Sequence, residues 1–449
     1  MPRCTHPGSR PAGAFVGSLL VLILVAGCSL LDSRAAETDA GSGVGTTTAP
    51  FTPTPSPSPT TEEVTEARHA ASDLVERRVA AVVAKDKAAW LATVADPAGG
   101  FNSDQGALFD RMTKLPLGKL ALRTVDIERP TGDATTGDPG WWVARVRQTY
   151  AFTGYDPGQR DFTVSYRLAR TPEGWRFTGV ADGQNDVQPF DLPRLAVVSS
   201  ATTLVIGDLP TATLRAYLAL GNAAHDRIVA VWGEAQPAVI VAPSSLDALK
   251  AQLGPGRGDG FDQIAAVTDG PLVRDGAAQS DRVYLNPDAF KELSVTGRGV
   301  VVTHELTHVT VRASTSRSVP VWLSEGFADD VAIAPTGLSV RSVAADLLDQ
   351  VRAGKGPTQL PDETAFDPAK GQIAPAYSAA WLAVSRMRQR YGQEKVVAFY
   401  RAIAGPKVGE PSVNASPAQL TSTAFETGLG TNQDAFVADW LANVKRLAR

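Results

Sequence analysis

The first folded part of the chain is marked by a change from helical to alternating hydrophobic patterns. Residues 65–85 are alanine-rich with apolar positions at helical spacing, and a second helical pattern begins at Asp86. Alternating apolar and polar positions then predict four strands, over residues 120–127, 141–152, 162–168 and 175–180. Helices followed by a meander of long strands indicate an α+β domain with a curved antiparallel sheet over residues 62–190.

From residue 191 to residue 449 the pattern becomes mixed and then mainly helical. A strand pair is expected over 196–206, and residues 281–286 have the composition of a further strand. The other predicted elements are a long helix, a strand, a helix and a C-terminal helix, over residues 214–232, 238–242, 245–253 and 435–447. We therefore expect a second domain, 191–449, in which helices predominate after Thr303.

The chain begins with a segment that resembles a bacterial lipoprotein signal. Residues 1–27 carry Arg3 and Arg10 without an acidic residue, followed by an uncharged apolar run of 14 residues. This pattern is typical of a signal peptide, and the run is too short to span a bilayer comfortably. It ends in Val-Ala-Gly-Cys, which resembles a lipobox and implies cleavage before Cys28 and a diacylglycerol on its thiol. The alternative is a plain secretory signal with an incidental cysteine.

Residues 28–61 separate this signal from the folded part. They are rich in Ser, Thr, Gly and Pro, including an alternating Thr-Pro and Ser-Pro run at 52–59. Such a segment has too few apolar side chains to fold, so we expect an extended, partly polyproline-II tether. With a lipid on Cys28, the protein would be exported and held on the outer side of the cytoplasmic membrane, in the cell envelope.

Charge and cysteine content limit the classes of partner. The chain has a formal net charge of -4 at neutral pH, and loss of the two signal-peptide arginines changes it to -6. A mildly acidic chain without a basic run is a poor nucleic-acid binder, so no nucleic acid is expected. The cysteines are Cys4 and Cys28, so no thiol pair remains after processing and the fold must depend on a hydrophobic core.

The segment HELTH at residues 304–308 carries the clearest chemistry in the sequence. His304 and His308 are four residues apart, so on a helix they lie on one face and can bind one metal ion. Glu305 follows the first histidine, which places its carboxylate beside the metal, where it can take a proton from metal-bound water. The spacing therefore predicts a metal-dependent hydrolytic site.

A third metal ligand is expected on a following helix. Glu325 lies 17 residues after His308, in an apolar segment preceded by the helix-start residues Ser318 and Pro320. A catalytic zinc ion takes three protein ligands and keeps one position open, and Glu325 is the best candidate for the third. Asp329, one helical turn further along, can hydrogen-bond the free ring nitrogen of a ligand histidine and fix its tautomer.

HELTH together with WLSEGFADD at residues 322–330 resembles the gluzincin metallopeptidases, most closely the bacterial peptidase-MA-like domains. The resemblance extends from about Leu195 to the C-terminus and implies a zincin fold with bound Zn²⁺. It implies that His304, His308 and Glu325 are the zinc ligands. It also implies that Glu305 is the general base and Asp329 the outer hydrogen-bond partner. In such enzymes an edge strand near the metal helix pairs with extended substrate, and residues 281–286 are the best candidate.

The first folded part resembles the NTF2-like (SnoaL-like) domains in its order of helices and strands. This resemblance implies a cone formed by helices and a curved sheet. Residues 62–190 offer no evident acid–base pair in an apolar setting, and His69 is expected on a helix surface. We therefore interpret this part as a separable spacer, dimerisation or ligand-recruiting module rather than a second enzyme.

A further helical pattern begins at Ala376 and ends at Gly392, where glycine is typical of a helix end. Tyr377 and Trp381 share one stripe of this helix. The resemblance implies that the phenol of Tyr377 hydrogen-bonds the oxyanion of the reaction beside zinc. The alternative is that Tyr377 is a core aromatic, as residues in such stripes often are.

Two functions are consistent with these patterns. The first is a zinc-dependent peptidase that hydrolyses a peptide or protein substrate at the cell envelope, with Glu305 as general base. The alternative is a noncatalytic envelope lipoprotein that uses a zincin fold for binding or assembly, and the intact Glu305 argues against it. The motifs do not encode the natural substrate or the oligomeric state.

Overall fold

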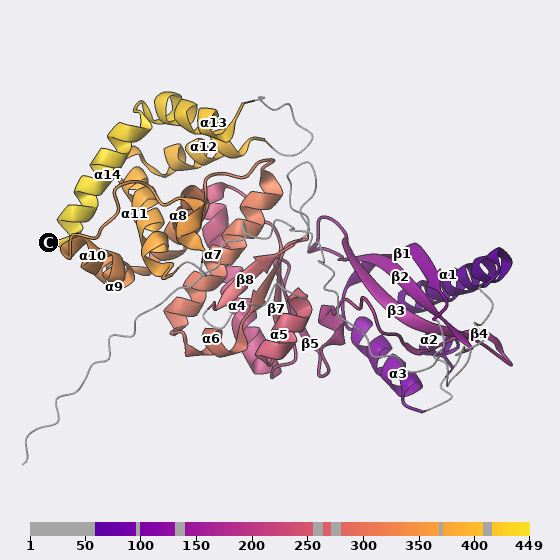
Figure 1. The fold of residues 1–449 in the computed structure, drawn as a ribbon. Coiled ribbons are helices and arrows are strands. Elements are labelled where there is room, and N and C mark those ends of the chain that lie inside the picture. Colours follow the sequence, from indigo (N-terminus) through magenta and orange to yellow (C-terminus); the bar gives the residue numbers. More distant parts are fainter. Residues whose placement is uncertain are drawn as a thin grey trace, which may run out of the picture.

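The computed structural model describes residues 59–95, 99–130, 140–254, 264–270, 280–367, 371–406 and 415–449. The predicted signal peptide, Cys28 and nearly all of the predicted tether lie outside these residues. Among the helices in these ranges, none combines the length and apolar character that a bilayer crossing requires. The described chain is a mixed α/β structure with an antiparallel sheet and a helical C-terminal region (Figure 1).

The first sheet is antiparallel, with its four strands side by side in chain order. They are β1 (Leu117–Glu128), β2 (Trp141–Phe152), β3 (Arg160–Thr171) and β4 (Gly174–Val180). The helices described before them are α1 (Thr61–Ala84), α2 (Lys87–Leu91) and α3 (Phe101–Met112). The two predicted helices and all four predicted strands are confirmed, whereas the sequence pattern did not predict α3.

Helix α1 covers one face of this sheet because its apolar stripe is buried there. The helix begins with a capping box in which Thr60 and Glu63 satisfy each other's backbone N–H groups. One buried cluster joins the helix to the sheet, with Ala71, Leu74 and Val75 packed with Val146, Leu168 and Phe177. His69 lies on the exposed side of α1, as predicted.

The second sheet has five strands and mixed direction. They are β5 (Ala196–Ser199), β6 (Thr203–Gly207), β7 (Ala238–Ala242), β8 (Ala266–Asp269) and β9 (Arg282–Leu285), in the order β5-β6-β7-β9-β8. Strands β6, β7 and β9 are parallel, and β8 runs antiparallel to β9. The prediction that 281–286 forms an edge strand is wrong, because β9 lies between β7 and β8. A strand pattern does not specify neighbours, and β8 has too few residues to show a period.

Most of the described helices lie around and after this sheet (Figure 1). The first group is α4 (Thr211–Trp232), α5 (Leu246–Leu253), α6 (Pro287–Glu292), α7 (Val295–Ser314) and α8 (Val321–Ile333). The second is α9 (Val340–Val343), α10 (Ala345–Arg352), α11 (Ala374–Tyr391), α12 (Gln393–Ala404), α13 (Pro417–Thr423), a π-helical turn (Ala424–Gly428) and α14 (Gln433–Ala448). The predicted helices at 214–232, 245–253 and 435–447 are therefore present.

The two faces of the second sheet are buried against different parts of the chain, because side chains alternate along each strand. On one face Val205, Ile240 and Val283 join a cluster with α4 and α7. On the other face the sheet contributes Leu204, Ile206, Val239, Val241 and Tyr284 to a second cluster, which also contains Tyr150, Phe152 and Phe162 of the first sheet. The two sheets therefore share one hydrophobic core, which includes Phe190 at the predicted domain boundary.

Candidate metal centre

Helix α7 presents two histidines on one buried face. Ser294 caps the helix start, and the segment from Val300 to Val311 is buried between the second sheet and the helices that follow. One turn separates His304 from His308, and their Nε2 atoms lie 3.0 Å apart. The rings themselves are nearly perpendicular, at 76°. The predicted pairing of the two histidines is therefore present in the folded chain.

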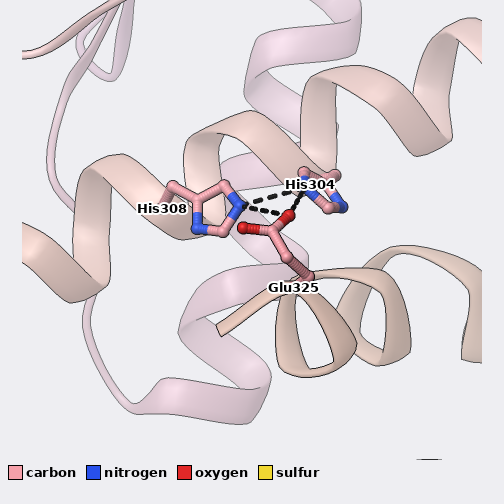
Figure 2. A group of neighbouring side chains, drawn as sticks. All are labelled: His304, His308 and Glu325. Carbon is pink, nitrogen blue, oxygen red and sulfur yellow. Dashed lines mark hydrogen bonds and ion pairs between the residues drawn. The ribbon is translucent and has the colours of Figure 1, made fainter. Parts of the chain in front are cut away.

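Helix α8 packs against α7 and brings the carboxylate of Glu325 to the same point. Its Oε2 atom lies 3.3 Å from Nε2 of His304 and 3.4 Å from Nε2 of His308. Figure 2 shows the two rings and the carboxylate directed toward one another. Ligand atoms of a tetrahedral zinc site stand about 3.3–3.6 Å apart, if metal–ligand distances are about 2.0–2.2 Å. The two distances to Glu325 match this spacing and the 3.0 Å between the histidine nitrogens is slightly shorter, so these three buried side chains form a group that could hold a metal ion.

Asp329 supports the first histidine from the outer side. Its Oδ1 atom lies 2.8 Å from Nδ1 of His304, and this contact leaves Nε2 directed toward His308 and Glu325. The predicted contact between Asp329 and a free ring nitrogen is thus present. A carboxylate in this position fixes the tautomer of a ligand histidine and increases its basicity.

The electrostatics of the metal-free group favour a cation between the carboxylates. Burial alone would lower the pKa of His304, but Asp329 and Glu325 outweigh it and raise the pKa to about 10. Burial alone would raise the pKa of Glu325, but His308 and His304 lower it to about 2. Both shifts favour a positive charge between the carboxylates of Asp329 and Glu325, and a divalent cation would supply that charge in place of a proton.

Glu305 lies beside the metal group and is held by a strand of the second sheet. The hydroxyl of Thr268, in β8, donates to Oε2 of Glu305 over 2.6 Å and to its backbone carbonyl oxygen over 3.2 Å. The other carboxylate oxygen, Oε1, is buried without a hydrogen-bond partner among the described residues. Burial also raises the pKa of Glu305, against the influence of His304 and His308. One oxygen is therefore fixed and the other is available for proton transfer.

An ion pair lies one turn beyond His308 on the same helix. Arg312 contacts the buried carboxylate of Asp281 over 3.1 Å, from Nε to Oδ2. Burial raises the pKa of Asp281 to about 6, even though Arg312 opposes this shift. Asp281 directly precedes β9, so the pair connects α7 to the second sheet.

An ion pair between α8 and α11 holds the helix that carries Glu325. The guanidinium of Arg388 donates to both carboxylate oxygens of Asp330, over 2.6 and 3.1 Å. Burial raises the pKa of Asp330, and Arg388 opposes this shift. Bidentate pairs of this kind fix orientation as well as distance.

Tyr377 lies near the start of α11 and is buried in the core. Its ring is edge-on to Phe366, with 5.1 Å between ring centroids. This packing agrees with the interpretation of Tyr377 as a core aromatic. Its assignment as an oxyanion ligand stays a prediction.

Sequence reasoning missed the residues that reach the centre from the second sheet. Thr268 belongs to an unpredicted strand, and Asp281 has no spacing relationship to the metal motif although it pairs with Arg312 of the same helix as that motif. Comparisons of the chain with protein families, with curated proteins and with solved structures found no match. The site is therefore interpreted from its own geometry.

Proposed function

We propose that this protein is a zinc-dependent peptidase of the cell envelope. The observation that carries the proposal is the position of Glu305. Its carboxylate is buried, interacts electrostatically with His304, His308 and Glu325, and keeps one oxygen without a hydrogen-bond partner among the described residues. A structural metal site has no need of an additional carboxylate in this position, whereas hydrolysis needs a base next to the reacting water.

The donor set supports zinc as the metal. Two imidazole nitrogens and one carboxylate oxygen form one of the ligand sets of catalytic zinc, and such sites keep a position open for water or substrate. His304, His308 and Glu325 would hold the ion, and Asp329 would orient His304. When bound, zinc would polarise the carbonyl of the scissile bond and lower the pKa of a coordinated water.

Side chains of the protein would carry out the proton transfers and bind the oxyanion. Oε1 of Glu305 would take the proton from the attacking water and later deliver it to the nitrogen of the leaving amine. The hydroxyl of Thr268 holds Oε2, so the carboxylate cannot rotate freely during these transfers. The phenol of Tyr377 would hydrogen-bond the developing oxyanion if its hydroxyl reaches the substrate.

The proposed fold and location follow from the resemblances and the chain start. The N-terminal part would be an NTF2-like cone and the C-terminal part a gluzincin-type domain. A diacylglycerol on Cys28 supplies two acyl chains, which hold a protein at a membrane stably, whereas one chain does so only marginally. Replacing Cys28 by Ser should abolish lipid labelling, and labelled lipid on that variant would contradict the anchor.

A paired measurement of metal and turnover tests the enzymatic proposal. Elemental analysis should find about one zinc per chain, and His304→Ala should lose it. Digestion of a peptide library should stop with a chelator and with Glu305→Gln, which should keep its zinc yet lose several orders of magnitude in turnover. Zinc-loaded native protein that cleaves no peptide would favour the noncatalytic alternative, and an active Glu305→Gln protein would refute the mechanism.

A further inference from the structure

Arg160 ties the first sheet to the strands beside the metal centre. This residue begins β3, and its Nη1 donates to the carbonyl oxygens of Asp269 and Ser280, over 3.2 and 3.0 Å. Its Nη2 donates to the carboxylate of Asp269 over 2.9 Å. The two side chains are only 15% and 11% exposed, so solvent screens this pair less than a surface pair. Arg160 thereby holds the end of β8 and the residue shortly before β9.

A second arginine makes the reciprocal connection. Arg282 begins β9, is fully buried, and donates to the hydroxyl of Tyr150 and to the carboxylate of Asp156 over 3.0 Å. Its guanidinium also lies 4.3 Å from the ring centroid of Phe152. All three partners belong to β2 or the loop that follows it. A buried charge that loses its partners is strongly destabilising, so the contacts of Arg282 with the first sheet stabilise the folded position of β9.

The same short strands contact the metal helix through adjacent residues. Side chains alternate along a strand, so Asp269 and Thr268 point to opposite faces of β8. Asp269 meets Arg160 of the first sheet, and Thr268 meets Glu305 of α7. Strand β8 therefore lies between the first sheet and the proposed general base.

The second sheet holds β8 along one edge of the strand. The strand has four residues and lies at the edge of the sheet, where β9 is its one hydrogen-bonded neighbour among the described strands. Short edge strands paired on one side are weakly held. The ties from Arg160 supply a second support, on the side directed away from α7.

We propose that the N-terminal part of the chain is a built-in positioning module for the active site. Through Asp269, Arg160 fixes β8 so that Thr268 holds Oε2 of Glu305 and leaves Oε1 free for proton transfer. Arg160 is then a positioning residue, because it acts through Thr268 and touches no reacting atom. This inference rests on the proposed peptidase function, and it replaces the idea of a separable spacer with that of a required partner.

A double-mutant cycle between Arg160 and Thr268 tests the proposal. Arg160→Met should lower kcat about tenfold to a hundredfold, with KM and bound zinc unchanged, because a small displacement of a catalytic group is costly. Thr268→Val should have a similar effect, and the double variant should be no slower than Thr268→Val alone. Losses in kcat that multiply in the double variant would overturn the proposal.

Arg386 provides a matched control. It makes a bidentate pair with Asp439 over 2.8 and 2.9 Å, both side chains are partly buried, and the pair lies between α11 and α14. Arg386→Met should therefore lower stability without changing kcat. If Arg160→Met does not fold, Arg160→Lys serves in its place. Lysine keeps the positive charge but lacks the planar guanidinium that joins the carboxylate and the two carbonyl oxygens. Arg160→Lys should therefore lose less kcat than the tenfold to hundredfold expected for Arg160→Met.

Hydrogen exchange of the β8 amides gives a readout that needs no substrate. In zinc-loaded protein, Arg160→Met should speed exchange in β8, and Arg386→Met should not. If the native protein cleaves no peptide but exchange changes as expected, the peptidase function fails and the positioning role stands. If the native protein cleaves peptides and Arg160→Met matches it in both kcat and exchange, the positioning role is wrong.

Discussion

Gly326 lies so close to Ala380 that a Cβ atom added to Gly326 would collide with the carbonyl oxygen of Ala380. The contact joins α8 to α11, directly beside the proposed ligand Glu325. Gly326→Ala should therefore push α8 away, cost about 1–3 kcal/mol of stability through overpacking, and weaken zinc binding. Denaturant unfolding and zinc titration measure the two effects.

Gly299 supplies the control for this substitution. It lies in α7, and a Cβ atom there would meet Leu220 at 3.9 Å, which is ordinary contact. Gly299→Ala should keep zinc affinity and gain up to roughly 1 kcal/mol, because alanine favours a helix over glycine. Equal behaviour of the two variants would contradict the close-approach argument.

Asp329→Asn should weaken zinc binding while the ligand set stays intact. The amide cannot supply the negative charge that orients and strengthens His304, so affinity should fall by about tenfold to a hundredfold. Competition with a chromophoric chelator measures this loss. The neighbouring Asp330→Asn instead breaks the pair with Arg388 and should lower stability more than zinc affinity. An unchanged affinity in Asp329→Asn would show that the contact with His304 has no role in binding.

Zinc binding near neutral pH should release a proton from His304. In the metal-free protein the pKa of this ring is about 10, so the ring is protonated below that pH and must lose its proton to bind metal. Affinity should therefore rise with pH up to about 10, by about tenfold per unit for a single proton. Calorimetry in buffers of different ionisation enthalpy counts the protons. Asp329→Asn should flatten this dependence, and a flat dependence in the native protein would contradict the assignment.

Tyr377→Phe distinguishes a catalytic phenol from a packed ring. The substitution keeps the edge-on contact with Phe366 and removes only the hydroxyl. If the phenol binds the oxyanion, kcat should fall about tenfold to a thousandfold at unchanged zinc content. A native kcat would assign Tyr377 to the core.

The part of the site that lies within single helices could be predicted from the sequence. His304 and His308 share a face by helical geometry alone, and so do Glu325 and Asp329. The partners that come from strands could not be predicted. Thr268 reaches Glu305 because β8 joins the edge of the second sheet, and which strands become neighbours depends on packing of the whole chain.

The same distinction applies to the fold, in which single elements could be predicted from the sequence and the neighbours of a strand could not. Long periodic segments such as 141–152 and 214–232 were predicted at nearly their observed bounds. The edge position expected for 281–286 was wrong, because β9 is paired on both sides. The long-range contacts of Arg160 and Arg282 could not be predicted from the sequence either, because a charged residue in a strand pattern normally indicates an exposed position.

Phe162 of the first sheet and Ile206 of the second lie in one buried cluster, so neither sheet can unfold without exposing apolar surface of the other. We therefore expect one cooperative thermal transition, with equal calorimetric and van't Hoff enthalpies, where two independent domains would give two. A fragment that begins near Pro189 should aggregate, since it would expose one face of its sheet and the unpaired charge of Arg282. Proteases and chaperones that act on unfolded chains would then encounter this protein either fully folded or fully unfolded, without a partly folded form that retains the metal centre.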